Sequence, residues 1–452
     1  MAPNLPTENI HSHNLKQLLA SKIDEHNKKV STFRKLHGGT VVQNLTVDMI
    51  YGGMRSLKAL LTETSEIDPE KGIQFRGYAF EECLKLLPKA TNGEQPLPEG
   101  VFFLLLTGEI PNEAQVEEIS REWARRSEVP EHVEKTLKTF PKTLHPMAQM
   151  SAAIASLAGD SKFAKAFANK VPKSSYWEYV YEDAMDLLAK LPKIAAMIYR
   201  NLYKDGVVHG EIDSSKDWSS NYASFLGNNS PQFIELIRLY NTIYCDHEGG
   251  NVIAHTCQLV ASSLSNPYLA YSAAMGALAG PLAGGAHAEV LFFLNKLTSE
   301  HGYDIDEENL RFLLWEHLIS SQVIPGYGHA VLRTTDPRDT AFRSFGLKHL
   351  PNNPYMKLCS ALYNTVPDIL IEQGKVKNPY TNVEAHSGVL LQHFGIQEVD
   401  FYPVMIGVAR AIGCMSQMIW DRGMGLPIER PKSISTESLM KLVNEKKTVV
   451  FD

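Results

Sequence analysis

The sequence predicts a mainly α-helical protein, and three observations support that prediction. Apolar residues recur at helical spacing through several long segments. Strand signals are few, and only TVVQNLTV at residues 40–47 and TVVF at residues 448–451 could form short strands. No GxGxxG sequence follows a strand, no Walker A sequence is present, and no alternating β/α rhythm runs along the chain.

Helical spacing is clearest in three segments. Pro192 falls inside the first segment and predicts a kink or a break there. The second begins at Asp306, which precedes two glutamates and an apolar run, as at a capped helix start. The third carries Arg410 inside an apolar stretch, so this charge is either paired within the protein or meets an anionic ligand. The apolar positions are Met185, Leu188, Leu191, Met197 and Ile198 in the first segment, and Val404, Val408, Ile412, Met415 and Ile419 in the third.

Residues 249–288 contain no Asp, Glu, Lys or Arg, which at first resembles a membrane span. Pro267 and Pro281 interrupt the stretch, and a sustained run of about 20 strongly apolar residues is missing. The many small side chains instead predict two closely packed interior helices.

Composition limits the classes of function. The chain has 452 residues, of which 44% are apolar, and a net charge of −7. A global basic field for nucleic acid or an anionic membrane is therefore absent, so we expect neither partner. Five scattered cysteines without a CxxC pair favour a reducing, intracellular environment. The N-terminal residues carry no clear targeting pattern, and we expect a cytoplasmic or mitochondrial matrix protein.

The segment Pro325–Arg338, PGYGHAVLRTTDPR, is suited to a small molecule with several negative charges. Its glycines allow the main chain to approach a ligand closely. His329 can handle protons near neutral pH, and Arg333 and Arg338 supply forked donors for carboxylate or phosphate oxygens.

Three other groups of polar residues have both functional and structural interpretations. Asp246, His247 and Glu248 precede a Gly-Gly pair and fit the start of a helix. The spacing of His247 and His255 is not that of a metal-binding motif, so we expect no metal here. Further along, Lys375 and Lys377 are either solvent-exposed charges or part of a phosphate-binding rim. Glu384, which follows them, could serve as a general base. Near the C-terminus, Arg422 fits a helix-capping charge, whereas Arg430 has no evident local role.

Together, CDHEGGNVIAHT, LAGPLAGGA, PGYGHAVLRTTDPR, NPYTNVEAHSGVLL and LPIERPKS resemble the citrate synthase family in its eukaryotic form, most like the fungal type. The resemblance implies a mainly α, two-domain homodimer. Residues 1–285 and 388–452 would form the large domain, and residues 286–387 a small, mobile domain that closes over the site. The family condenses acetyl-CoA with oxaloacetate and hydrolyses the resulting thioester, without a tightly bound cofactor or a metal.

The resemblance also assigns roles to individual residues. The oxaloacetate site would consist of His247, His329, Arg338 and Arg410, with Arg430 reaching in from the partner subunit. The CoA contacts would come from Arg55, Arg333, Lys375 and Lys377. His329 would also take part in catalysis.

Two catalytic positions depart from the family pattern. Ala283 stands where the family has a histidine that donates a hydrogen bond to the thioester oxygen, and Glu384 stands where it has an aspartate base. Loss of one such donor typically costs about 10²–10³ in rate. His287 lies one helical turn beyond Ala283 and is a candidate substitute donor, although it also fits a polar surface or hinge residue.

These departures lead to a main functional hypothesis and its rivals. Gly285 and Ile406 are smaller than the usual residues, which with Ala283 predicts a wider acyl pocket. We therefore expect an alkylcitrate synthase of fungal secondary metabolism, which condenses a longer acyl-CoA with oxaloacetate. The alternatives are an ordinary citrate synthase and a catalytically degenerate homologue with a scaffolding or regulatory role. An engineered variant is disfavoured because Gly285 and His287 differ as well.

Overall fold

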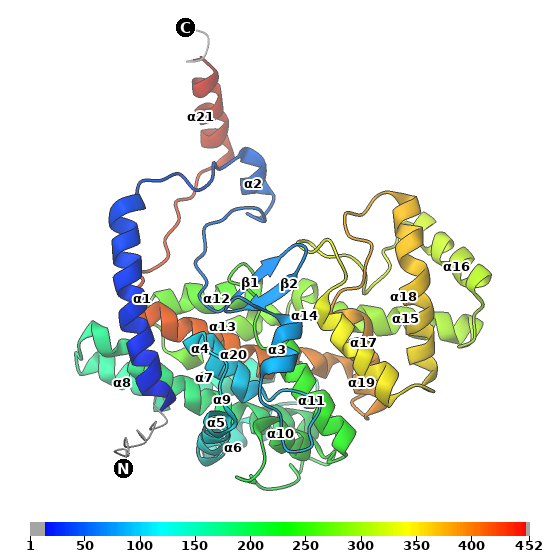
Figure 1. The fold of residues 1–452 in the computed structure, drawn as a ribbon, viewed down its shortest axis with the longest axis horizontal. Coiled ribbons are helices and arrows are strands. Elements are labelled where there is room, and N and C mark those ends of the chain that lie inside the picture. The colour runs from blue at the N-terminus through cyan, green and yellow to red at the C-terminus, as the bar shows by residue number, and fades with distance from the viewer. Residues whose placement is uncertain (1–13, 449–452) are drawn as a thin grey trace, which may run out of the picture.

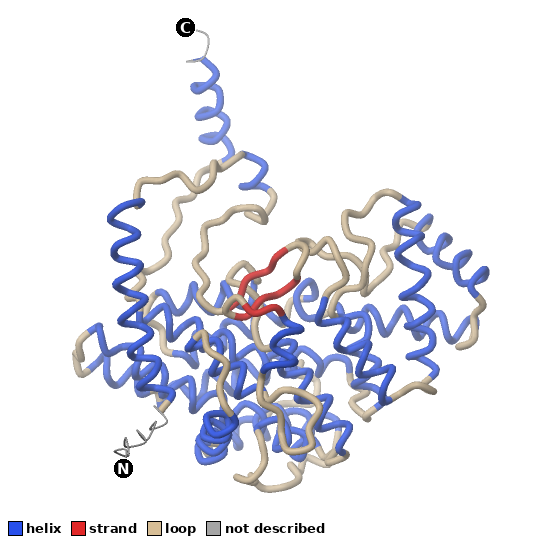
Figure 2. Tube along the Cα trace, viewed as in Figure 1, coloured by secondary structure: helices blue, strands red, loops and turns tan. Residues whose placement is uncertain are grey.

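The computed structural model describes residues 14–448, and helices make up most of it (Figures 1 and 2). The mainly α prediction is confirmed. A large body of helices surrounds α9 and α20, and a second group, α15 to α19, lies beside it at the right of Figure 1. The N-terminal part of the chain consists of α1 Leu15–His37, α2 Val47–Tyr51, β1 Ser65–Asp68, β2 Gly72–Phe75 and β3 Tyr78–Ala79.

The only strands in the described part of the chain form one small antiparallel sheet in the order β1-β2-β3. Its register pairs Ser65 with Phe75 and Gln74 with Ala79. The strand predicted at residues 40–47 is wrong: the segment is an exposed loop that ends at Thr46, whose side chain accepts from the Met49 N–H and caps α2. The second predicted strand spans residues 448–451. Only Thr448, the last residue of α21, lies within the described residues.

The body of the molecule packs around α9, which contacts α5, α7, α8, α10 and α20. The break predicted at Pro192 is wrong, because α9 continues through that residue. Nineteen buried side chains hold α9 in place and outweigh the one backbone hydrogen bond that proline cannot make. The helices of this region are α3 Phe80–Leu86, α4 Pro98–Thr107, α5 Glu113–Arg126, α6 Glu131–Thr139, α7 Pro146–Ser156, η1 Leu157–Asp160, α8 Lys162–Ala168, η2 Lys173–Ser175, α9 Tyr176–Tyr203, α10 Trp218–Leu226 and α11 Pro231–Tyr244.

The charge-free stretch forms α12 Val252–Ser262 and α13 Pro267–Leu278, which pack against each other as predicted. A short turn, α14 Pro281–Gly284, follows and leads into α15 Ala286–His301. Ala283 therefore lies in the tight connection between two helices rather than within a long one.

Helices α15 to α19 pack on one another: α15 and α17 contact α19, and α18 contacts both α16 and α19. The remaining members are α16 Glu307–Ile319, α17 Pro337–His349, α18 Pro354–Gln373 and α19 Glu384–His393. The Asp306 side chain accepts from the Asn309 N–H, which confirms the predicted cap of α16. The predicted domain limits remain a prediction, and α19 spans the limit at residue 387.

After η3 Val399–Phe401, α20 Tyr402–Gly423 confirms the predicted apolar helix around Arg410. The stretch Val399–Gly423 is long and apolar enough to cross a membrane, but 89% of its most apolar window is buried inside the protein. We therefore interpret α20 as a core helix.

The last helix, α21 Thr436–Thr448, lies away from the body beside α2 (Figure 1). The Tyr51 hydroxyl donates to Thr436 Oγ1 at 3.0 Å and joins the two segments. Several large apolar side chains near α1 and α2 are exposed, namely Phe33, Leu36, Val41, Val42 and Leu45.

Candidate active site

Four of the predicted oxaloacetate ligands converge from separate elements. His247 lies in the loop between α11 and α12, His329 precedes α17, Arg338 is in the first turn of α17, and Arg410 lies in the middle of α20. Burial, followed by the charges of Arg338 and Arg410, holds the pKa of His247 well below its usual value. His247 is therefore a neutral imidazole among positive charges.

Arg410 is a buried cation whose contacts are all uncharged. Its side chain is 3% exposed. Nε donates to the Tyr244 carbonyl at 2.9 Å, and Nη1 donates to Asn251 Oδ1 at 3.2 Å. Within residues 14–448, no carboxylate lies at ion-pair distance from this guanidinium. Because an unpaired buried charge is costly, the site is suited to an anionic ligand.

Arg338 is held by a carboxylate two residues away. Its Nε lies 3.0 Å from Asp336 Oδ1, and its Nη2 lies 2.6 Å from Asp336 Oδ2. Burial acts to raise the pKa of Asp336, but the charge and hydrogen bonds of Arg338 outweigh it and hold that pKa below its usual value. The sequence interpretation assigned no role to Asp336, although its position as N-cap of α17 was readable from the DPR sequence.

The backbone fixes the proton of His329. Nδ1 accepts hydrogen bonds from the Val331 and Leu332 N–H groups, both at 3.0 Å. Burial, followed by the charge of Arg338, lowers the pKa of His329. The neutral ring therefore carries its proton on Nε2, which is left as a hydrogen-bond donor.

The His329 loop lies directly against the start of α19. The Asn382 N–H donates to the Gly326 carbonyl, and the Gly328 N–H donates to the Tyr380 carbonyl, both at 2.9 Å. Gly326 has a φ of +84°, and a Cβ there would lie 3.1 Å from the Ala385 Cα. Glycine therefore allows this close approach.

Glu384, His287 and Tyr244 form a compact cluster. His287 Nε2 lies 2.6 Å from Glu384 Oε2, and the Tyr244 hydroxyl lies 3.0 Å from each of these two atoms. The His287 side chain is 2% exposed and that of Glu384 16% exposed. Glu384 is the first residue of α19, where the helix dipole stabilises its negative charge. Sequence reasoning missed Tyr244, for which the only signal was its position just before the CDHEGG motif.

A second buried pair ties α17 to α19 next to these side chains. His386 Nδ1 lies 2.7 Å from Asp339 Oδ1, and both side chains are at most 1% exposed. Asp339 directly follows Arg338 in the chain, and His386 lies two residues after Glu384. Sequence reasoning did not single out this pair.

Four of the predicted ligands are not gathered at this cluster. Arg55, Lys375, Lys377 and Arg430 are exposed on the described part of the chain. Arg333 lies in the His329 loop, but its Nη1 donates to the Leu332 carbonyl at 2.8 Å.

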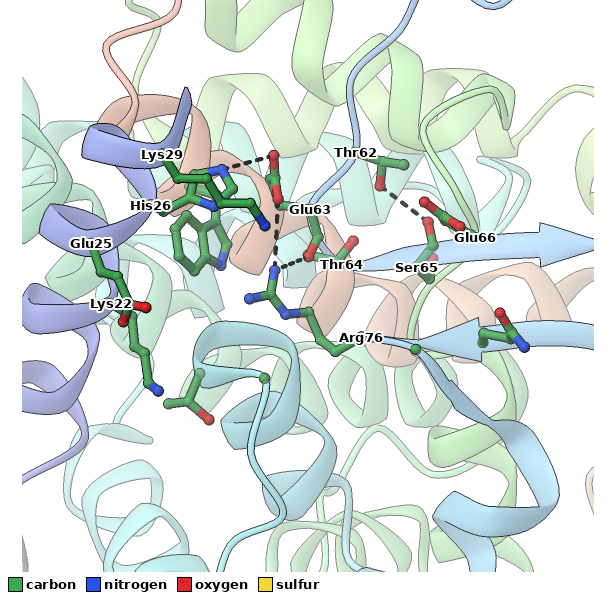
Figure 3. Close-up of a pocket in the computed structure, with 15 residues that line it drawn as sticks. Lys22, Glu25, His26, Lys29, Thr62, Glu63, Thr64, Ser65, Glu66 and Arg76 are labelled. Atoms are coloured by element: carbon green, nitrogen blue, oxygen red, sulfur yellow. Dashed lines mark hydrogen bonds and ion pairs between the residues drawn. The ribbon is translucent and has the colours of Figure 1, made fainter. Parts of the chain in front are cut away.

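A separate polar pocket of about 530 Å³ lies between α1, β1, β2 and α20 (Figure 3). In Figure 3, Glu63 points toward both His26 and Arg76. Glu63 Oε1 lies 3.1 Å from His26 Nε2, and Glu63 Oε2 lies 3.8 Å from Arg76 Nη1. None of the predicted site residues lines this pocket. These two contacts to Glu63 join α1 to the segment after β2, which is typical of a structural contact. Among the described residues, no group of three or more His, Cys, Asp or Glu side chains could hold a metal ion.

The fold is that of citrate synthases with solved structures. The citrate synthase from Pyrobaculum aerophilum matches with a TM-score of 0.74 and 23% identity, over 85% of this chain and 92% of that one. A ternary complex of citrate synthase with carboxymethyl coenzyme A and oxaloacetate, from Thermoplasma acidophilum, matches with a TM-score of 0.71 and 19% identity, over 87% and 97% of the two chains. These matches define the class as a citrate synthase-like helical protein.

The chain belongs to the citrate synthase family, because the family model described as "Citrate synthase, C-terminal domain" matches residues 53–432. A protein named "Probable citrate synthase, mitochondrial" from Caenorhabditis briggsae is 61% identical over 431 residues, which are 95% of this chain and 92% of that protein. "Citrate synthase, mitochondrial" from Kajikia audax is 55% identical over 435 residues, which are 96% and 93% of the two chains. The chain is therefore a citrate synthase-like acyltransferase.

These relatives correct the main functional hypothesis. They are animal proteins named as ordinary citrate synthases, so the alkylcitrate synthase prediction is wrong, and nothing supports the fungal type or secondary metabolism. The wider-pocket argument gave too much weight to small residues. A Cβ at Gly285 would lie 2.6 Å from the Pro281 carbonyl oxygen, so the α14–α15 turn by itself accounts for this glycine. Ile406 lies in the packed core of α20.

Proposed function

We propose that the protein is a citrate synthase that condenses acetyl-CoA with oxaloacetate and releases citrate and free CoA. One observation carries this proposal: the buried Arg410 guanidinium has no carboxylate partner among the described residues, and Arg410, Arg338 and His329 all act on the buried His247. Such a cluster is complementary to a small dicarboxylate. The names of the relatives support the same reaction.

In this proposal Arg338 and Arg410 bind the two carboxylates of oxaloacetate, and His247 helps to hold the substrate. His329 donates from Nε2 to the keto oxygen, because its Nδ1 is already occupied by two backbone donors. The hydrogen bond polarises the keto carbon, and the alkoxide that forms there takes this proton.

Glu384 acts as the general base in place of the usual aspartate. Its Oε2 contacts both His287 and Tyr244, which leaves Oε1 to take a proton from the acetyl methyl group. The resulting enolate carbon attacks the keto carbon and forms the new carbon–carbon bond. Water then cleaves the thioester, which gives citrate and the CoA thiol.

His287 takes over the donor role that Ala283 cannot perform. His287 Nε2 contacts Glu384 Oε2 at 2.6 Å, and the second ring nitrogen, Nδ1, is the donor in this proposal. Nδ1 is buried and makes no hydrogen bond within the described residues, so it is free to donate to the thioester oxygen.

Coenzyme A would bind at the rim of the site. Lys375, Lys377, Arg333 and Arg55 would contact its phosphates once the small domain, residues 286–387, closes. No tightly bound cofactor or metal takes part.

The active form in this proposal is a homodimer in the mitochondrial matrix. The exposed Arg430 lies on the segment that leads from α20 to α21, away from the body, which suits a residue that enters the site of the partner subunit. The exposed apolar side chains near α1 and α2 would be buried between subunits. The compartment rests on the names of the relatives.

The test is release of CoA thiol by the purified dimer with acetyl-CoA, in the presence and absence of oxaloacetate and of a metal chelator. The expected result is thiol release that requires oxaloacetate and is unaffected by the chelator, with citrate as the product. Oxaloacetate binding without turnover would overturn the proposal in favour of the degenerate homologue. A protein that ignores oxaloacetate in calorimetry would overturn both.

A further inference from the structure

Tyr244 contacts both halves of the candidate site. It is the last residue of α11 and is 2% exposed. Its carbonyl oxygen accepts from Arg410 Nε at 2.9 Å, while its hydroxyl reaches Glu384 Oε2 and His287 Nε2. The substrate-binding cation and the acid–base pair are thus joined through a single side chain and its own main chain.

We propose that Tyr244 is a positioning residue, which fixes the Glu384–His287 pair so that Glu384 Oε1 faces the substrate. This inference rests on the proposed function of that site.

The hydroxyl can act only as a donor to the carboxylate. Burial, followed by the charge of Glu384, raises the pKa of Tyr244 well above its usual value, so the phenol keeps its proton throughout the neutral range. Its single O–H proton goes to Glu384 Oε2 at 3.0 Å. Since His287 contacts the same oxygen, Oε2 is occupied by two groups and Oε1 is left free.

The contact from Tyr244, in addition to that from His287, matters because glutamate is longer than aspartate. The extra methylene adds one rotatable bond, so the carboxylate needs an additional contact to hold one orientation. The Tyr244 ring is itself packed against neighbouring aromatic side chains, with centroids 4.6 Å from Tyr240 and 6.0 Å from Phe342. The hydroxyl therefore has a fixed position from which to orient the flexible glutamate.

Tyr240 supplies a matched control. It lies one helical turn earlier on α11, is equally buried, and its hydroxyl makes no hydrogen bond within the described residues. Replacement of either tyrosine by phenylalanine removes one buried hydroxyl, but only Tyr244→Phe removes a contact to the pair. We expect Tyr244→Phe to lower kcat by about 10- to 100-fold, as for loss of a hydrogen bond to a charged group, and to change KM for oxaloacetate by less than about twofold. Tyr240→Phe should leave both unchanged.

A double-mutant cycle separates positioning from general stability. Glu384→Asp shortens the arm and draws the carboxylate away from Tyr244, so Tyr244→Phe should cost little in that background. An equal cost in both backgrounds, or no cost in the parent protein, would overturn the inference.

A third measurement does not depend on turnover. The ¹⁵N shifts of the His287 ring, identified among the sixteen histidines by their absence in His287→Asn, report the protonation and hydrogen bonding of both ring nitrogens. Tyr244→Phe should shift them and Tyr240→Phe should not; unchanged shifts in both would overturn the inference. A parent protein that releases no thiol but shows these shifts would refute the proposed reaction and leave the Tyr244 contact established.

Discussion

The replacement His287→Asn tests whether this side chain has taken over the role of the missing donor at Ala283. The variant removes the 2.6 Å contact to Glu384 Oε2 and the proposed donor Nδ1, which makes no hydrogen bond within the described residues. Loss of one donor to a developing oxyanion typically lowers kcat by about 10²–10³, or about 2.7–4 kcal/mol of transition-state stabilisation. Because none of the four proposed oxaloacetate ligands makes a hydrogen bond or ion pair with His287 in the described structure, the affinity for oxaloacetate should change by less than about twofold.

The assay is thiol release under saturating acetyl-CoA and oxaloacetate, with calorimetry for oxaloacetate alone. His301→Asn is the matched control, since His301 ends the same helix and its side chain is 38% exposed. That control should retain full activity. The double variant Ala283→His with His287→Asn restores the usual family donor and should recover part of the lost kcat.

A His287→Asn variant with kcat within about twofold of the parent would refute the reasoning, because no donor would then have been lost. A large fall in oxaloacetate affinity would also contradict it, since the effect would then lie in the binding cluster rather than in the acid–base pair.

Three further predictions follow from the described contacts. Arg410→Gln should weaken oxaloacetate binding by about 10- to 100-fold in calorimetry, as for loss of a charged hydrogen bond. Arg311→Gln, at a half-buried arginine that pairs with Glu372 on α18, should not, and equal affinities would contradict the role of Arg410. Burial raises the pKa of Asp421 from 3.8 to about 7, so the native state retains that proton and loses stability as pH rises from about 4 to about 7. Asp421→Asn should therefore raise the free energy of unfolding at pH 8 and change it little at pH 4. At about 1.4 kcal/mol per pKa unit, the increase at pH 8 is at most about 4 kcal/mol. An equal change at both pH values in denaturant titrations would contradict the raised pKa of Asp421. Arg430→Ala and Arg410→Gln subunits can be mixed at an oxaloacetate concentration at which neither variant alone releases thiol. The mixture should restore about a quarter of the parent thiol release per site if hybrid dimers form in statistical proportion, since one site of each hybrid is intact and hybrids are half of the dimers. No recovery in verified hybrids would contradict the crossing of Arg430 between subunits.

Local patterns predicted local structure well. The α16 cap at Asp306 and the buried helix around Arg410 depend on neighbouring residues, so the sequence was sufficient for both. The errors came from long-range packing. Pro192 does not end α9, because helices from other parts of the chain hold it, and residues 40–47 find no strand partner. Likewise, the Tyr244–Glu384 contact joins residues 140 positions apart, and no spacing rule could reveal it.

The functional prediction was strongest where several motifs acted together. The family was identified correctly from ordered motifs, whereas the acyl preference rested on single small residues. Gly285 shows why that failed, since a side chain there would meet the Pro281 carbonyl, and its absence says nothing of the substrate.

The buried bond between Asp339 and His386 has a mechanical consequence. It joins the beginning of α17 to the beginning of α19, the helices that carry Arg338 and Glu384. A change that removes either partner would leave the other polar group buried without its bond, at a typical cost of about 1–3 kcal/mol. The spacing between the guanidinium and the carboxylate therefore depends on two side chains that belong to neither group.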